Sequence, residues 1–268
     1  MIEKYYNGVI EQVAGGIGNV EHNSILVRYS NDFSIWDLES VNHYKDQTDI
    51  FFTCHEFSYN KIAEAYEPYL GLIRQMFHKY CSGTLEEFME ECDVYKLQRP
   101  VFESYFEKGF CERTEQILID EVEYEQERMR NSIVTMLQKL SEIRPVVIVL
   151  NRFQLASKST MQLSNSLLQV KNKNIGIVLG VNDVQSIPEF AHEEWDAICE
   201  SMDDRNMVYH IGNAGRNMEP DVMDYYSDYE SDDGYRKLNN LVYFLDFDQA
   251  NHHLSKIERR IKFDNFTI

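Results

Sequence analysis

Two stretches of this sequence lie where a phosphate-binding loop would be expected. Such a loop has glycine at both ends, so that backbone N–H groups surround the phosphates, and closes with lysine and a hydroxyl residue that binds magnesium. The first stretch follows the apolar residues 24–28 and reads Tyr29, Ser30, Asn31, Asp32, Phe33, Ser34, Ile35 and Trp36. Asp32 would repel a phosphate and Trp36 would fill the magnesium position. We therefore predict no nucleotide binding of the usual kind.

The second stretch follows the most apolar segment of the chain, 146–150, and reads Ser157, Lys158, Ser159 and Thr160. It has the lysine and hydroxyls of a phosphate loop. The two positions that need glycine are Arg152 and Ser157, so this turn cannot bring its amides around a phosphate. We predict a loop that leads into a helix capped by Ser159 or Thr160.

No other stretch of the sequence has the residues and spacing of a known binding or catalytic motif. Gly15 to Gly18 precedes a strand, whereas a dinucleotide-binding loop follows one. Residues 228–239 place glycine seventh and Asn239 twelfth, which breaks the calcium-loop pattern. Cys54 and His55 are adjacent on a predicted strand and would point to opposite faces, so they predict no zinc site. No hydrolase or zinc-protease motif occurs. We expect no catalytic residue and no metal site.

The composition indicates a cytoplasmic protein whose partners are neither nucleic acid nor membrane. No apolar run approaches the roughly 20 residues that span a bilayer, and the N-terminal residues lack the pattern of a secretory signal. The five cysteines are odd in number and widely spaced, as expected of reduced thiols. A net charge of −19 would repel nucleic acid and anionic lipid.

Much of the negative charge lies in one segment. Residues 219–233 contain seven acidic side chains and no basic one, interleaved with Tyr225, Tyr226 and Tyr229. Such a composition is typical of a solvated loop, and we place this acidic, tyrosine-rich loop at 213–235. It is also a surface that could meet a basic protein partner.

The pattern of apolar residues predicts an α/β fold. Five short segments rich in β-branched or aromatic residues predict strands, at 24–28, 49–54, 146–150, 175–180 and 207–211. Strands that alternate with helices and read as continuous apolar runs predict a parallel sheet with helices on both faces. In such sheets ligands bind beyond the carboxyl ends of the strands, which here are Arg28, Cys54, Leu150 and Gly180.

Helical spacing fills the segments between the strands. It predicts helices after Asn31, over 59–80, from Thr160 onward, after Pro188, and over 238–268 with a break near Asp246. Residues 84–140 show only helical spacing and predict a helical insertion between the second and third strands. The expected organisation is an α/β domain at 1–212, the acidic loop at 213–235 and a helical connector at 236–268.

In this order, residues 145–167 resemble the Walker B strand and following helix of the STAND and AAA-like regulatory ATPases. Those families carry acidic residues where this chain has Asn151, Arg152 and Ser157. They place their P-loop after a strand that corresponds to 25–27, where the glycines and lysine are missing here. A strand followed by an aromatic-rich helix matches 51–69, and Asn182 stands at the position of a sensor residue. The resemblance implies a P-loop-NTPase-like fold with degenerate Walker motifs.

The chain also resembles the N-terminal ATPase-like domain of bacterial signalling proteins that carry TPR repeats and a GGDEF diguanylate cyclase downstream. That resemblance implies that the sequence is a fragment, with the residues from 236 leading into further domains. It also implies that its partners are other proteins or downstream domains of the same polypeptide.

Three functions are compatible with the sequence. The leading hypothesis is a pseudo-NTPase regulatory module without turnover or cofactor, because the phosphate cradle and the metal carboxylate that ATP and Mg²⁺ require are both replaced. The second is an enzyme such as an ATPase, or a sensor, that binds nucleotide or another small molecule in the same crevice through four strand-end residues: His55, Glu56, Arg152 and Asn182. The third is a protein–protein scaffold.

Overall fold

The computed structural model describes residues 2–18, 23–30, 34–45, 49–58, 61–111, 122–170, 172–183, 187–203, 207–211 and 232–264. For 232–233 and 256–264 it describes the backbone alone. Five parallel strands form one sheet in the order β2-β3-β4-β1-β5. The strands are β1 (Ser24–Tyr29), β2 (Phe51–Glu56), β3 (Val146–Asn151), β4 (Ile175–Asn182) and β5 (Val208–Ile211). This confirms the predicted α/β class, and the sheet is consistent with a P-loop-like fold.

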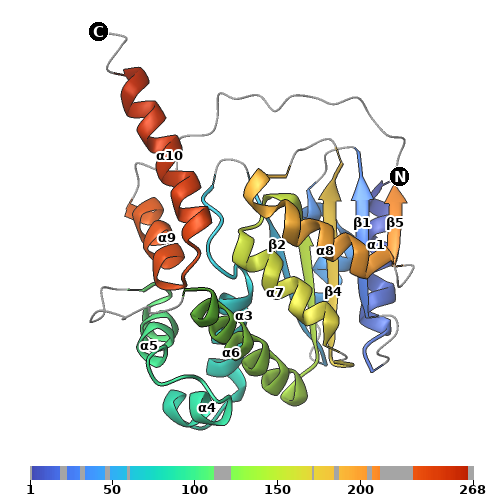
Figure 1. Ribbon diagram of the computed structural model, residues 1–268. Helices are drawn as coiled ribbons and strands as arrows, with labels where there is room; N and C mark the ends of the chain where they lie inside the picture. The colour runs from blue at the N-terminus through green and yellow to red at the C-terminus, as the bar shows by residue number, and fades with distance from the viewer. Residues whose placement is uncertain are drawn as a thin grey trace.

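The position of each strand follows from its composition. β3 and β4 are apolar along almost their whole length, lie at the centre of the sheet and are buried at every residue. β2 is half-buried throughout and β5 is partly exposed, as expected of the two strands at the edges. In Figure 1 the labelled strands point the same way, so their carboxyl ends form one edge.

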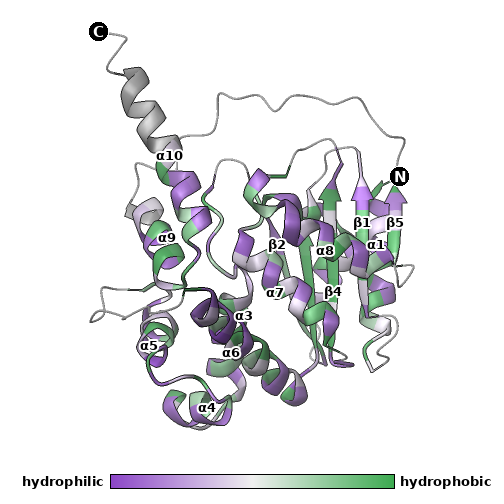
Figure 2. Cartoon of the chain, in the orientation of Figure 1, coloured by the Kyte–Doolittle hydropathy of each residue, from purple (hydrophilic) through white to green (hydrophobic). Residues whose placement is uncertain are grey.

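Helices cover both faces of the sheet. α1 (Ile2–Gly15) contacts β1, β3 and β4 and α2 (Glu39–Lys45) contacts β2, whereas α7 (Lys158–Gln169) and α8 (His192–Asp203) pack on each other in front of the sheet (Figure 1). Figure 2 shows hydrophobic residues along the strands and on helix surfaces that face them. The turn at Gly15–Gly18 joins α1 toward β1, with Gly18 N donating to Lys173 O at 2.7 Å, and it lies away from the carboxyl edge.

A group of helices extends the domain beyond β2. It comprises α3 (Tyr69–Tyr80), α4 (Leu85–Glu91), α5 (Arg99–Lys108) and α6 (Val122–Ile143). The prediction of a helix over 59–80 was wrong for its first part, because residues 61–68 form turns and α3 begins only after Pro68. Proline removes a backbone donor and disfavours helical geometry in the residue before it.

Two helices close the described chain, α9 (Asp232–Tyr243) and α10 (Phe247–Asp264). The break predicted near Asp246 is confirmed, since Leu245 adopts a left-handed φ of 64° and α10 starts directly after Asp246. α9 begins four residues before the boundary drawn at 236. The rest of the acidic loop, 213–231, lies outside the described residues.

Candidate functional site at the carboxyl edge of the sheet

The two expected phosphate-site strands are joined at their ends by a buried hydrogen bond. Tyr29, the last residue of β1, donates its hydroxyl to Asn151 Oδ1 of β3 at 2.8 Å. The intervening strand β4 passes between them at Gly180, which carries no side chain. Tyr29 is 1% exposed and Asn151 fully buried, so Asn151 binds a neighbouring tyrosine rather than solvent.

Tyr6 of α1 closes this cluster from the helical face. Its ring meets that of Tyr29 edge-on at 6.5 Å, and its hydroxyl lies over Gly180. A Cβ on Gly180 would collide with Tyr6 Oη and would lie 2.6 Å from Asn151 Oδ1. Burial, followed by the neighbouring Tyr29, raises the pKa of the Tyr6 hydroxyl well above its usual value. The cluster is therefore neutral, closely packed and closed.

Glu56 contacts the turn that follows β1, where a phosphate loop was expected. Its Oε2 accepts long hydrogen bonds from Ile35 N at 3.4 Å and Ser34 Oγ at 3.5 Å, at the start of the 3-10 turn η1 (Ile35–Asp37). Its Oε1 lies 3.5 Å from Nε of Arg152. A carboxylate of the protein thus lies next to the first backbone amide of this turn.

The remaining residues of the expected phosphate loop divide between the core and the surface. Ile35 is fully buried, whereas Trp36 is 47% exposed with Lys45 Nζ 4.6 Å from its ring centroid. The expectation that Trp36 fills a magnesium position was therefore wrong, because Trp36 lies at the surface and Ile35 is the buried residue of this turn. Ser30 ends the described part of the loop, and Asn31, Asp32 and Phe33 lie outside the described residues.

Arg152 and Asn182 are fixed by the turn that follows β3. Arg152 adopts a left-handed φ of 53°, a conformation that costs an L-residue about 1–2 kcal/mol. The turn continues as η2 (Phe153–Leu155), where the fully buried Gln154 accepts a hydrogen bond from Asn182 N at 3.3 Å. Asn182 itself is 4% exposed, so the sensor position lies inside the fold.

The second phosphate-loop candidate is a helix N-terminus, as predicted, but its cap is Ser157. Ser157 Oγ accepts from Thr160 N at 3.2 Å and donates to Glu64 O at 2.9 Å. The prediction of Ser159 or Thr160 as the cap was wrong, because both lie inside α7 and bond to the 61–68 segment: Ser159 Oγ accepts from Tyr66 N and Thr160 Oγ1 donates to Glu67 O.

An internal carboxylate occupies the N-terminus of α7. Ser159 N donates to Asp246 Oδ2 at 3.0 Å, while Asp246 Oδ1 accepts from Gln249 N in the first turn of α10. One carboxylate, 4% exposed, therefore binds the N-termini of two helices, where the helix dipoles favour negative charge. Burial raises the pKa of Asp246, against the lowering effect of its bonds to Ser159 and Gln249.

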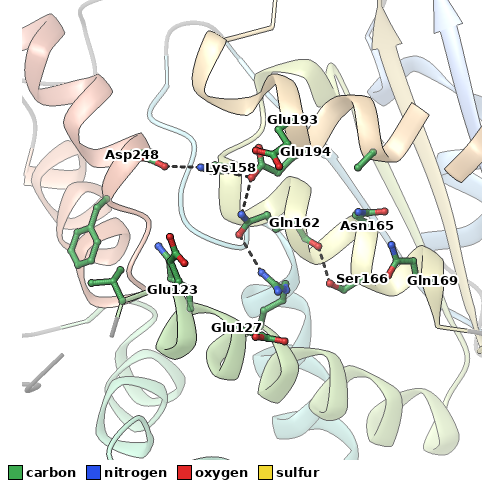
Figure 3. Close-up of a pocket in the computed structure, with 15 residues that line it drawn as sticks. Glu123, Glu127, Lys158, Gln162, Asn165, Ser166, Gln169, Glu193, Glu194 and Asp248 are labelled. Atoms are coloured by element: carbon green, nitrogen blue, oxygen red, sulfur yellow. Dashed lines mark hydrogen bonds and ion pairs between the residues drawn. The ribbon is translucent and has the colours of Figure 1, made fainter. Parts of the chain in front are cut away.

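Lys158 adds a second link between α7 and α10. Its Nζ donates to Asp248 Oδ2 at 2.7 Å and lies 3.7 Å from Glu194 Oε1 of α8 (Figure 3). Phe244, between α9 and α10, packs edge-on against Tyr66, Phe102 and Tyr105. The C-terminal helices are thus held by the first residue of α7 and by aromatic residues of the 61–68 segment and α5.

His55 does not join Glu56 and Arg152. It lines a cavity of about 240 Å³ with Glu64, Glu67 and Tyr105, and its Nε2 lies 3.6 Å from Glu67 Oε1. Burial, followed by the charges of Lys61 and Lys237, lowers the pKa of His55 to about 4. The ring is therefore neutral at pH 7, and its contact with Glu67 is a polar contact rather than an ion pair.

Sequence reasoning missed three functional groups: Tyr6, Glu56 as a cap, and Asp246. A signal existed for Asp246, since an acidic residue directly before a helix is a common N-cap. No local pattern indicates which distant helix end its second oxygen binds. Tyr6 had no signal, because only the packing of α1 on the sheet brings it over Gly180.

Among the described residues, no group of three or more His, Cys, Asp and Glu side chains is arranged to hold a metal ion. In the same part of the chain, no helix is long and apolar enough to cross a membrane. The sequence matches no model of a known protein family and no curated protein.

Proposed function

We propose that this chain is a non-catalytic, pseudo-NTPase-like regulatory domain that relays binding events to its C-terminal helices and to downstream protein partners. The observation that carries the proposal is the pair of internal carboxylates at the carboxyl edge. Asp246 binds the amide of Ser159 at 3.0 Å, and Glu56 lies 3.4 Å from the amide of Ile35. Both amides already donate to a carboxyl oxygen of the protein itself, so a phosphate would have to displace that group.

The residues that replace the Walker B acids support the same conclusion. Asn151 is neutral and hydrogen-bonded to Tyr29, and Arg152 adds a positive charge where a cation would bind. Phosphoryl transfer depends on positioning and on charge stabilisation by metal and cationic groups. In the described part of this edge the Walker B positions carry no carboxylate and the first loop no glycine, and we infer that neither ATP nor Mg²⁺ is a cofactor.

The proposed relay runs through α7. This helix begins seven residues after the end of β3, and its Ser159 and Lys158 bind Asp246 and Asp248 of the C-terminal segment. A displacement of the strand-end turn would therefore be transmitted to α9 and α10 through two charged contacts. We propose further that the domain works in the cytoplasm, since all five cysteines are free thiols and fit a reducing compartment.

The test is ATP hydrolysis by the purified chain, with Asn151→Ala and Arg152→Ala as variants. We expect no turnover above the buffer rate in any of the three. Hydrolysis by the wild type that either substitution abolishes would overturn the proposal.

A thermal-shift screen with nucleotides, cyclic dinucleotides and metabolites separates this function from the small-molecule sensor. Ligand binding raises the midpoint in proportion to ligand concentration relative to Kd. A regulatory module that responds to proteins gives flat profiles, whereas a specific stabilisation of several degrees, lost in Arg152→Ala, favours the sensor.

A further inference from the structure

A long polar groove crosses the helical face of the domain, away from the strand-end cluster. It has a volume of about 730 Å³ and lies between α6, α7, α8 and the first residues of α10 (Figure 3). α7 contributes a row of hydrogen-bonding side chains: Lys158, Gln162, Asn165, Ser166 and Gln169. Their spacing of three or four residues places them on one side of the helix.

The walls of the groove are acidic. α6 contributes Glu123 and Glu127, α8 contributes Glu193 and Glu194, and α10 contributes Asp248. The two cations in the lining are already engaged within the protein. Lys158 pairs with Asp248 and Glu194, and Arg130 Nη1 donates to Gln162 Oε1 at 3.3 Å. The lining therefore retains a net negative charge.

Two buried polar atoms of residues that line the groove have no hydrogen-bond partner, and both are acceptors. Glu194 has a side chain only 11% exposed; its Oε1 accepts from Gln162 Nε2 at 2.8 Å, whereas its Oε2 is buried without a hydrogen-bond partner. Asn165 Oδ1 is buried without a partner as well. Buried acceptors that lack a donor carry a desolvation cost of about 1–3 kcal/mol each. A hydrogen-bond donor that reached these acceptors would relieve this cost.

The length of the groove favours a peptide over a small cation. The row from Lys158 to Gln169 spans twelve residues of helix, or roughly 17 Å at the usual helical rise. That length matches about five residues of extended chain. Carboxamides along the floor can both donate to and accept from a peptide backbone, while carboxylates on both walls suit guanidinium groups.

We propose that the groove between α6, α7, α8 and α10 binds an extended, arginine-containing segment of a partner protein. The groove shares the Lys158–Asp248 contact with the proposed relay, but this inference does not depend on the absence of nucleotide binding.

The test is fluorescence anisotropy with a labelled hexa-arginine peptide at low ionic strength. We expect saturable binding to the wild type, weakened about tenfold or more by Glu123→Lys/Glu127→Lys, because two attractive charges become repulsive. The matched control is Glu86→Lys/Glu90→Lys on α4, which also changes an exposed pair spaced by four residues and alters the net charge equally. It should change Kd less than about twofold.

Asn165→Ala tests the floor of the groove without changing the charge, and we expect it to weaken the peptide measurably. Melting temperatures of all variants check that they fold. Equal weakening by the two charge reversals would show attraction to the overall negative charge and overturn the proposal, as would the absence of binding. Spermine that binds as tightly as the peptide would also overturn it, in favour of a small-polycation site.

Discussion

Gly180 is the residue whose substitution reports most directly on the closed strand-end cluster. A methyl group there would collide with Tyr6 Oη and Asn151 Oδ1. We expect Gly180→Ala to lower the free energy of unfolding by about 1–3 kcal/mol, the usual cost of overpacking. Urea denaturation of the variant and the wild type measures this loss. Gly8→Ala in α1 is the control, because nothing lies within 4 Å of an added Cβ there. Equal stability of Gly180→Ala and wild type would mean that Tyr6 does not fill this space.

His55 should make the free energy of unfolding depend on pH. Its pKa is about 4 in the folded chain and 6.5 in the unfolded one, so only the unfolded chain gains a proton between these values. Wild type should therefore lose stability as pH falls from 6.5 to 4, by about 3 kcal/mol at ~1.36 kcal/mol per pH unit. His55→Gln should lack this component. If the difference in unfolding free energy between the two proteins stays constant over that range, the ring is not held neutral by burial.

Asp246 links two helices, because its carboxyl group binds the N-termini of both α7 and α10. Asp246→Ala removes an N-cap of α10 and the partner of Ser159 N. We expect a loss of about 1–3 kcal/mol in unfolding free energy. Hydrogen exchange should also become faster in α9 and α10 while the strands stay protected. Unchanged exchange in both helices would show that other contacts hold the C-terminal segment.

The charge of Asp246 adds a pH dependence of opposite sign to that of His55. Because burial raises its folded-state pKa above 3.8, the folded chain binds this proton more tightly than the unfolded chain does. The stability that wild type gains from this group should thus grow as pH falls from neutral toward 3.8. Asp246→Asn, which has no carboxyl to protonate, should not show this gain. A wild-type advantage that shrinks over the same range would contradict the assignment.

At the scale of the molecule, the fold could be predicted well and the site only in part. Each of the five strands lies within two residues of its predicted start and end, because continuous apolar runs and helical spacing are local signals. The predicted helix over 59–80 failed where Pro68 interrupts it. The contacts that close the edge, from Tyr6 to Gly180 and from Asp246 to Ser159, join residues far apart in sequence and depend on packing that no local pattern records.

The central claim is that the carboxyl edge is closed to nucleotide by groups of the protein itself. Calorimetric titration of ATP with Mg²⁺ into the wild-type chain tests it most directly, with Asn151→Asp alongside. An aspartate at that buried position would stand beside Tyr29 rather than a metal, so it should not restore binding. We predict no saturable heat for either protein at millimolar nucleotide. Saturable ATP binding by the wild type, lost in Arg152→Ala, would contradict the account.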